Sequence, residues 1–521
     1  MAFDFISGLK DMLDQEIPNV SVTENGAVGY QTTGTALLDL NFKLSSMRNW
    51  DDGKIWTEFL AAYNENPILS VIWMFFARDA RGGCGERHTF RVIFQHFAYE
   101  SPDLAIKLLP LIPEYGRWDD LIDIMCGDIP CKVRDAAFVI VRHQLTRDLD
   151  NMSAGKPISL MAKWMPSNVT SSKETVRKAE LIRVQLGMTP KKYRRTFADL
   201  RRYLDVTEQK MSANNWGDIN YEAVSSKAGM LYRDAFMRHD PNRYGRYLED
   251  VRDGKAKMNA SVVFPYEIVH AYINYDNWDT DIRDYDETLE LKWKNLPNTV
   301  EDSGGTLVVV DGSGSMSTSV GNTNVTCHDV ARSLGIYFAE RLTGAFKNSF
   351  ITFSANPKLI RFNGAETLRS KLEILVREDD CSNTNIEKTF DLILRTATEN
   401  HMKQEDMPKN ILIVSDMEFD ACTRDYGYNW SYTSTFSKPL FDEIADRWES
   451  AGYKLPRLVF WNVCSRSETI PVRENELGVA LVSGFSPNIA GMVMSGDLDP
   501  WKLLVDQLSS DRYLPVWEAI S

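Results

Sequence analysis

The sequence contains no hydrophobic run long enough to cross a membrane. A membrane-spanning helix needs about 20 consecutive apolar residues. The longest candidate, Ser70–Ala77, ends at the charged residues Arg78 and Asp79. The N-terminal residues Met1–Ile6 include an early acid and no basic start before an apolar core, which is not typical of a secretory signal. We therefore expect a cytoplasmic protein with no membrane partner.

Paired cysteines are also missing. The chain has seven cysteines, an odd number, and none of them forms a Cys-x-x-Cys motif. Zinc ribbons need such pairs, and disulfide frameworks use an even number of cysteines. We expect reduced thiols, which agrees with a cytoplasmic location.

The chain has no overall excess of positive charge. It has 59 Lys and Arg against 73 Asp and Glu, a net charge of −14, which argues against a protein that coats nucleic acid indiscriminately. The charge is uneven, however, because residues Lys173–Arg202 include ten bases and only three acids. A local basic patch can therefore still bind nucleic acid.

The first half of the sequence has a helical pattern. Apolar residues at three-and-four spacing predict helices from residue 36 to about 295, beginning with Ala36–Phe42, Ile55–Tyr63 and Ser70–Arg78. Short helices without strands between them favour a HEAT-like helical horseshoe or ring, although no fixed-period repeat is present.

The second half alternates strands with helices. Buried strands are expected at Thr306–Val310, Ser349–Phe353, Asn410–Asp416 and Arg457–Val463. This alternation predicts a doubly wound, mostly parallel α/β sheet, so the fold class is α + α/β. We assign residues 1–35 to an N-terminal arm, 36–298 to the helical-repeat domain and 299–521 to the sheet domain.

The strand Thr306–Val310 runs into the loop Asp311-Gly312-Ser313-Gly314-Ser315. In open α/β sheets, ligands bind beyond the carboxyl ends of the strands. Residues two apart in an extended loop project the same way, so Asp311, Ser313 and Ser315 should converge on one point. Hard oxygen ligands of this kind suit Mg²⁺ or another divalent cation.

Asp-x-Ser-x-Ser after a buried strand resembles the first part of the metal-ion-dependent adhesion site of von Willebrand factor A domains. That family also uses a Thr from a second loop and an Asp at the end of a third strand, for which Thr384 and Asp416 are the candidates. The resemblance implies a metal site made of Asp311, Ser313, Ser315, Thr384 and Asp416, completed by a partner's carboxylate or by water. The alternative for the glycine-serine loop alone is a solvated turn.

Serine hydrolase chemistry is not expected at this loop. His328 is the nearest histidine in sequence to Ser313 and Ser315, and it lies at the start of the following helix. Because neither serine has an adjacent base to activate it, we predict a binding site and no enzyme activity.

Three stretches of the helical half, Phe76–Arg87, Tyr115–Leu121 and Lys163–Ser167, resemble the helical (TROVE) module of the Ro ribonucleoprotein autoantigen family. The similarity is nearer to the family's uncharacterised relatives in plants, bacteria and viruses than to the autoantigen. It covers about residues 36–520 and implies a helical ring closed by a von Willebrand A domain. It also implies binding of structured small RNA on an outer basic face and of single-stranded ends in the central hole. The plainer interpretation of Gly82–Gly85 is a turn between helices, because the P-loop pattern is missing.

The stretch from residue 191 to residue 202 interleaves bases with aromatic residues, a combination that binds phosphates and stacks on unpaired bases. The alternative is a solvated helix face with Tyr193, Phe197 and Leu200 in the core. The candidate RNA-binding residues are Lys191, Lys192, Tyr193, Arg194, Arg195, Arg201 and Arg202.

The segment after Asp416 is rich in acids and aromatic residues. Tyr426, Tyr428 and Trp430 are candidates for binding a partner protein, because such side chains give a large contact area at low entropic cost. The alternative is a partly disordered insertion. The acids Glu418, Asp420 and Asp425 raise the possibility of a second cation.

These patterns favour a non-catalytic, Ro-like RNA-binding scaffold with a Mg²⁺-dependent site for a protein partner. A metal-dependent protein adaptor without RNA is the alternative, and the acidic net charge favours it. A Mg²⁺-dependent phosphoryl-transfer enzyme ranks third, because no phosphate loop accompanies the metal ligands.

Overall fold

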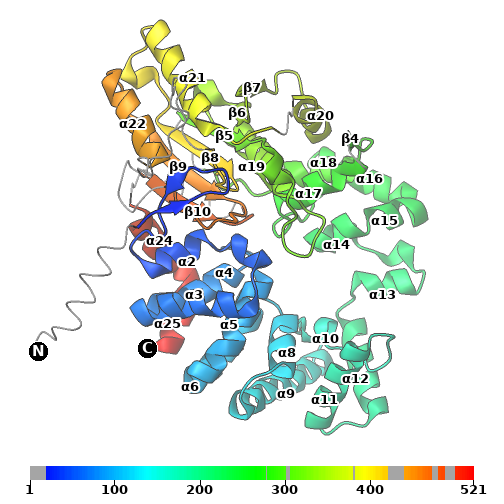
Figure 1. The fold of residues 1–521 in the computed structure, drawn as a ribbon. Coiled ribbons are helices and arrows are strands. Elements are labelled where there is room, and N and C mark those ends of the chain that lie inside the picture. Colours follow the sequence, from blue (N-terminus) through cyan, green and yellow to red (C-terminus); the bar gives the residue numbers. More distant parts are fainter. Residues whose placement is uncertain are drawn as a thin grey trace, which may run out of the picture.

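The structure is a computed structural model that describes residues 19–276, 279–300, 305–378, 382–420, 439–471, 479–486 and 499–521. It has mixed α/β architecture, with helices in the N-terminal half and a mostly parallel sheet in the C-terminal half (Figure 1). This agrees with the fold class predicted from the sequence. Within the described ranges, every helix is too short or too polar to cross a membrane.

Short helices follow one another through the N-terminal half. Their bounds are α2 (Ala36–Phe42), α3 (Asp52–Glu65), α4 (Pro67–Arg78), α5 (Arg87–Glu100), α6 (Pro102–Leu108), α7 (Ile112–Tyr115), α8 (Trp118–Cys126), α9 (Cys131–Ser153), α10 (Met161–Trp164), α11 (Lys173–Gln185), α12 (Pro190–Tyr203), α13 (Thr207–Ser212), α14 (Ser226–Leu231), α15 (Arg233–His239), α16 (Pro241–Arg252), α17 (Pro265–Tyr272) and α18 (Glu287–Lys294). A short hairpin, β3 (Ile273–Asp276) and β4 (Asp279–Ile282), interrupts the series where the sequence predicts only helices.

Helix α4 explains the longest apolar run of the sequence. Asn66 accepts a hydrogen bond from Leu69 N and Pro67 occupies the first turn, so the start of the helix is well defined. Every residue from Leu69 to Arg78 is buried, because α3, α5, α7, α24 (Pro500–Leu508) and α25 (Leu514–Ile520) surround the helix. The run is therefore a central helix of the core.

The six-stranded sheet has the order β10-β9-β8-β5-β6-β7. All neighbours are parallel except β6 and β7. Its strands are β5 (Thr306–Asp311), β6 (Ser349–Phe353), β7 (Lys358–Arg361), β8 (Asn410–Ser415), β9 (Arg457–Asn462) and β10 (Val479–Ser483). The helices that lie between these strands in the sequence are α19 (Cys327–Arg341), α20 (Leu368–Glu378), α21 (Ile386–Glu399) and α22 (Leu440–Ser450).

Alternate residues of the central strands enter different cores. Val309 and Ile413 pack with α21 and α22 on one face, whereas Val308 and Val414 pack with α19 on the other. The second core continues without a break into helices α2 to α9. The helical and sheet halves therefore share the core on the α19 face of the sheet.

Both ends of the helical half contact the sheet half, so the helices form an arc closed by the sheet (Figure 1). At the first end, Asn462 Nδ2 donates to Phe42 O at 3.0 Å. At the other end, His270 Nδ1 lies 2.8 Å from Asp329 Oδ2, joining α17 to α19. The C-terminal helix α25 packs on α4 and α6, away from the sheet to which the sequence assigns it.

Residues 19–35 differ from the predicted arm. They form a hairpin, β1 (Ser21–Val22) and β2 (Val28–Gly29), which lies on the sheet half. Tyr30 pairs with Ile470 and Gly26 with Asp420, and both are isolated bridges. Two-residue strands carry too little pattern to be predicted, so this docking appears only in the tertiary structure.

Candidate metal centre

Two acidic residues meet where the central strands end. β5 and β8 are parallel neighbours in the register Val310 opposite Val414, so their carboxyl ends coincide. Asp311 is the last residue of β5, and Asp416 directly follows β8. Both side chains are almost fully buried, at 1% and 0% exposure. Adjacent parallel strands therefore bring together two carboxylates that lie far apart in sequence.

The glycine-serine loop orients Asp311. Its Oδ1 accepts a 2.9 Å hydrogen bond from Ser313 N, and its Oδ2 accepts a 2.5 Å bond from Ser415 Oγ. The Ser313 and Ser315 hydroxyls lie 2.9 Å apart. These contacts hold the first three predicted ligands as one group.

The loop that carries Thr384 is tied to this group by backbone hydrogen bonds. Gly314 N donates to Ser382 O at 2.9 Å, and Asp420 N donates to Thr384 O at 2.9 Å. Thr384 is 1% exposed. The five residues that the sequence predicts as ligands thus lie at one edge of the sheet.

Burial raises the pKa of both acids, and the charges of neighbouring acids add to the shift. Burial raises the pKa of Asp311 to about 6, while hydrogen bonds from Ser415 and Ser313 oppose the shift. Burial and the charge of Asp311 raise the pKa of Asp416 to about 8, and the cation of Arg466 opposes this. Two buried carboxylates therefore stand close together with too little positive charge to balance them.

One atom of this group has no hydrogen-bond donor. Asp416 Oδ2 is buried and has no hydrogen-bond partner among the described residues. Its nearest cationic group is Arg466 Nη1, at 3.5 Å. A buried carboxylate oxygen that accepts no hydrogen bond from the described residues, beside a second acid and the hydroxyls of the loop, fits a hard divalent cation. The described part of the chain has no cluster of three or more His, Cys, Asp or Glu that could hold a metal.

The structure adds Arg466 and Glu418 to the site, in roles that the sequence does not predict. Arg466 Nη1 donates to Thr318 Oγ1 at 2.9 Å and to Ser315 O at 3.3 Å. Glu418 Oε1 accepts from the backbone N–H groups of Arg466 and Ser467, both at 2.7 Å. Its carboxylate therefore organises the 465–467 loop and is not free to ligate a second cation. No local motif marks either role.

The His328 side chain contacts the backbone of the glycine-serine loop. Its ring hydrogen-bonds the backbone of Gly312 and Ser313, and burial lowers its pKa to about 3, so it is neutral near pH 7. Its Nε2 has no hydrogen-bond partner within the described ranges. The arrangement therefore contains no Ser-His hydrogen bond of the kind that activates a nucleophile.

The three motif stretches of the helical half come together. Arg78 Nη2 donates to Asp120 Oδ2 at 2.6 Å, with side-chain exposures of 3% and 0%. The Arg117 guanidinium lies 4.1 Å from the Trp164 ring centroid. The turn prediction for Gly82–Gly85 is confirmed, because Cys84 N donates to Phe76 O at 3.2 Å. These motifs join helices, and the contacts are those of a packed core.

The predicted RNA-binding residues separate into two groups. Tyr193 is 1% exposed and its hydroxyl donates to Pro166 O, so its ring is not available to stack on a base. Arg201 is half-buried and donates to Ala162 O and Met165 O, so it too has a structural role. The exposed basic residues of α12 are Lys191, Lys192, Arg194, Arg195 and Arg202.

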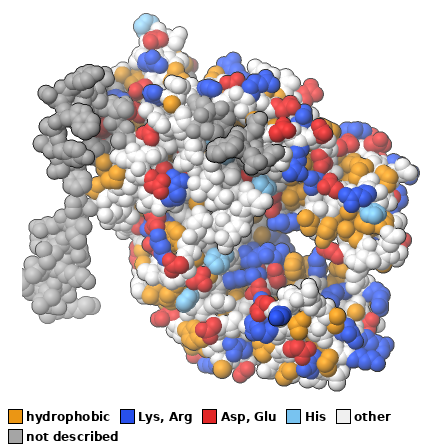
Figure 2. All heavy atoms as spheres, turned by 45° about the vertical axis from the view of Figure 1, so that its right-hand side comes forward, with side chains coloured by type: hydrophobic (Ala, Val, Ile, Leu, Met, Phe, Trp, Pro, Cys, Tyr) orange, Lys and Arg blue, Asp and Glu red, His pale blue; other side chains and the backbone are white. Residues whose placement is uncertain are grey.

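Figure 2 shows Lys and Arg side chains around a hollow in the middle of the molecule and on the lower helical part. The three proposed partner-binding residues Tyr426, Tyr428 and Trp430 lie outside the described residues, as does Asp425.

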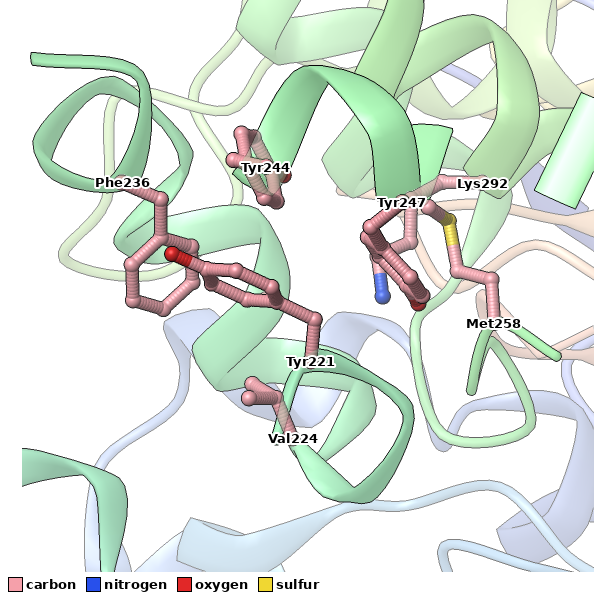
Figure 3. A pocket seen from close by; sticks show the side chains of 8 residues that line it. Tyr221, Val224, Phe236, Tyr244, Tyr247, Met258 and Lys292 are labelled. Atoms are coloured by element: carbon pink, nitrogen blue, oxygen red, sulfur yellow. The ribbon is translucent and has the colours of Figure 1, made fainter. Parts of the chain in front are cut away.

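A separate pocket lies between α16 and α18 (Figure 3). Tyr221, Tyr244, Tyr247 and the buried Lys292 line this pocket, and Lys292 Nζ donates to Asn259 O at 2.6 Å. The cavity is only about 10 Å³, close to the space for one water molecule, so it does not admit an organic ligand.

Comparisons with known proteins give two matches to families without an assigned function. Residues 305–502 match a family described as a domain of unknown function (DUF7788), and residues 169–306 match another, DUF2828. The chain is also 28% identical over 537 residues to the "Uncharacterized protein L728" of Acanthamoeba polyphaga mimivirus. That similarity covers 96% of this chain and 89% of the viral protein. The boundary between the family matches falls at residues 305–306, at the start of β5.

Proposed function

We propose that the chain is a non-catalytic binding protein that holds Mg²⁺ at Asp311, Ser313, Ser315, Thr384 and Asp416 and uses it to bind a protein partner. The buried Asp416 Oδ2, which accepts no hydrogen bond within the described residues and lies beside Asp311, carries this proposal. Asp311 and Asp416 would supply negative charge, and the three hydroxyls would supply neutral oxygen ligands. The metal, when bound, would attract a carboxylate of the partner.

This proposal treats the sheet half as a von Willebrand A-type domain and the helical half as a HEAT-like, Ro-like ring. The parallel sheet with the site at its carboxyl edge supports the first, and the arc of helices that returns to the sheet supports the second. We assign the protein to the cytoplasm, because the five cysteines in the described ranges are free thiols.

Isothermal titration of the full chain with Mg²⁺ and Mn²⁺ tests the metal site. Asp311→Asn keeps the side-chain shape but removes one charge, and we expect it to abolish measurable binding. Glu405→Gln, at an exposed acid of the same half, is the matched control and should bind as the wild type does. Equal binding by Asp311→Asn and the wild type would refute the proposal.

RNA binding on α12 is a second candidate function. The exposed bases Lys191, Lys192, Arg194 and Arg195 on one short helix favour it, as do the Lys and Arg side chains around the central hollow (Figure 2). The burial of Tyr193 weakens the case for base stacking but leaves phosphate contacts possible. If this function fails its test, the metal-dependent adaptor without RNA is what remains.

A further inference from the structure

The tip of the N-terminal hairpin lies against the rim of the candidate metal centre. Thr23 Oγ1 donates to Phe419 O at 2.6 Å, and Glu24 N donates to Glu418 Oε2 at 2.9 Å. Asn25 Nδ2 donates to Glu418 O at 2.6 Å. Thr23, Glu24 and Asn25 thus each bond to the segment that directly follows Asp416.

Asn25 also touches one of the predicted ligands. Its Nδ2 donates to Thr384 Oγ1 at 3.3 Å. A hydroxyl oxygen has two lone pairs, and a hydrogen bond from Asn25 uses one of them. The docked hairpin therefore reduces the capacity of Thr384 to ligate a cation.

Glu24 acts through Arg466. Arg466 Nη2 lies 2.8 Å from Glu24 Oε2, and its Nη1 lies 3.5 Å from Asp416 Oδ2. A guanidinium held at this distance repels a divalent cation that binds the same carboxylate. Glu24 therefore helps to hold a competing positive charge beside Asp416.

The hairpin stays in place through a few close contacts. Ala27 and Tyr30 are buried in the core of the sheet half, and Tyr30 exchanges two 2.8 Å backbone hydrogen bonds with Ile470. A Cβ at Gly29 would lie only 2.6 Å from Thr469 Cγ2 and 2.7 Å from Ile470 O. Isolated two-stranded hairpins are marginally stable, so this one depends on its docking to the sheet half.

We propose that the Thr23–Gly26 turn is a built-in occupant of the partner face of the metal centre, which an external partner must displace. The inference rests on the proposed metal-binding function and deepens it. Glu24 and Asn25 present a carboxylate and a carboxamide on a tight turn. The partner that competes with them is an acidic turn of a protein, whose carboxylate would reach the bound metal once the hairpin has left.

Gly29→Ala in the full chain tests this inference, because the added methyl group should force the hairpin away from Thr469 and Ile470. Hydrogen exchange of the peptide that spans residues 20–30 measures docking, and calorimetric titration with Mn²⁺ alone measures the site. Gly245→Ala is the matched control, since a Cβ there would meet no described atom within 4 Å. The double variant Glu24→Gln/Asn25→Ala removes the two contacts directly, without the steric change.

We expect Gly29→Ala and the double variant to exchange faster at residues 20–30 and to bind Mn²⁺ about tenfold more tightly. A tenfold gain in affinity corresponds to a rise of the metal-binding state, in which the hairpin is undocked, from about a tenth to most of the population. If exchange becomes faster but Mn²⁺ affinity is unchanged, while Asp311→Asn abolishes binding, the inference is overturned and the metal site stands. If the wild type and both variants fail to bind Mn²⁺, the proposed function itself falls, and the inference falls with it.

Discussion

Ser415, the last residue of β8, donates a 2.5 Å hydrogen bond from its hydroxyl to Asp311 Oδ2 on the neighbouring strand. The same hydroxyl accepts a 2.9 Å bond from Met417 N. Ser415 therefore joins the two halves of the candidate metal centre and fixes the orientation of one carboxylate, although it is not itself a predicted ligand.

Ser415→Ala is expected to weaken Mg²⁺ or Mn²⁺ binding by about tenfold, because groups that orient a metal ligand typically contribute 10- to 100-fold in affinity. Calorimetric titration of the full chain measures the effect. Ser333→Ala is the control, since that buried serine bonds only within its own helix, to Val330 O. An unchanged affinity in Ser415→Ala would show that Asp311 needs no such support.

Charge reversal on α12 tests RNA binding. With Lys191, Lys192, Arg194 and Arg195 changed to Glu, RNA retention on a filter is expected to fall by more than about tenfold at 0.1 M salt, because phosphate contacts dominate such affinity. The wild type should also lose RNA as salt rises. Lys403→Glu, at an exposed lysine of the sheet half, is the control. Purified wild-type protein that retains no RNA would rule this function out.

The buried ion pair between Arg78 and Asp120 should contribute strongly to the stability of the helical half. Arg78→Met leaves the Asp120 carboxylate buried with less compensation, so we expect a loss of about 3 kcal/mol or more in unfolding free energy. Chemical denaturation followed by circular dichroism measures it. Arg177→Met breaks an exposed pair with Glu174 and should cost less than about 1 kcal/mol. Equal losses in the two variants would contradict this assignment.

Lys292 should make stability depend on pH in the alkaline range. Burial among the tyrosines of Figure 3 lowers its pKa to about 8, whereas an unfolded lysine titrates near about 10.4. Between these values the unfolded chain binds more protons, so this residue's contribution to stability rises with pH. Below pH 8 the lysine is charged in both states and its burial penalty is complete.

Comparison with Lys292→Met isolates this effect from other titrations. The wild type should gain on the order of 3 kcal/mol relative to the variant between pH 7 and pH 10, measured by denaturant midpoints. Lys294→Met, at an exposed residue of the same helix, should show no such trend. A constant difference between wild type and Lys292→Met across this range would mean that Lys292 titrates normally.

The strands around the candidate site could be predicted because their signal is local. Thr306–Asp311 and Asn410–Ser415 are apolar runs buried on both faces, and such runs are recognisable without knowledge of their neighbours. The acids follow at the strand ends, where parallel sheets place ligands. Tyr193 shows the limit, because an aromatic residue at helical spacing has the same pattern whether it enters the core or faces solvent.

The sequence by itself determined the order of a helical half and a sheet half and the loop residues Asp311, Ser313 and Ser315, since periodicity and short loops act over a few residues. The resemblance to von Willebrand factor A domains added Thr384 and Asp416 as candidate ligands. Only the tertiary structure decided that Arg466 faces Asp416, that Glu418 is occupied by backbone donors, and that Asn25 reaches Thr384. The last contact joins residues 359 positions apart. A contact of that kind leaves no periodic pattern, because the packing of the whole core brings its partners together.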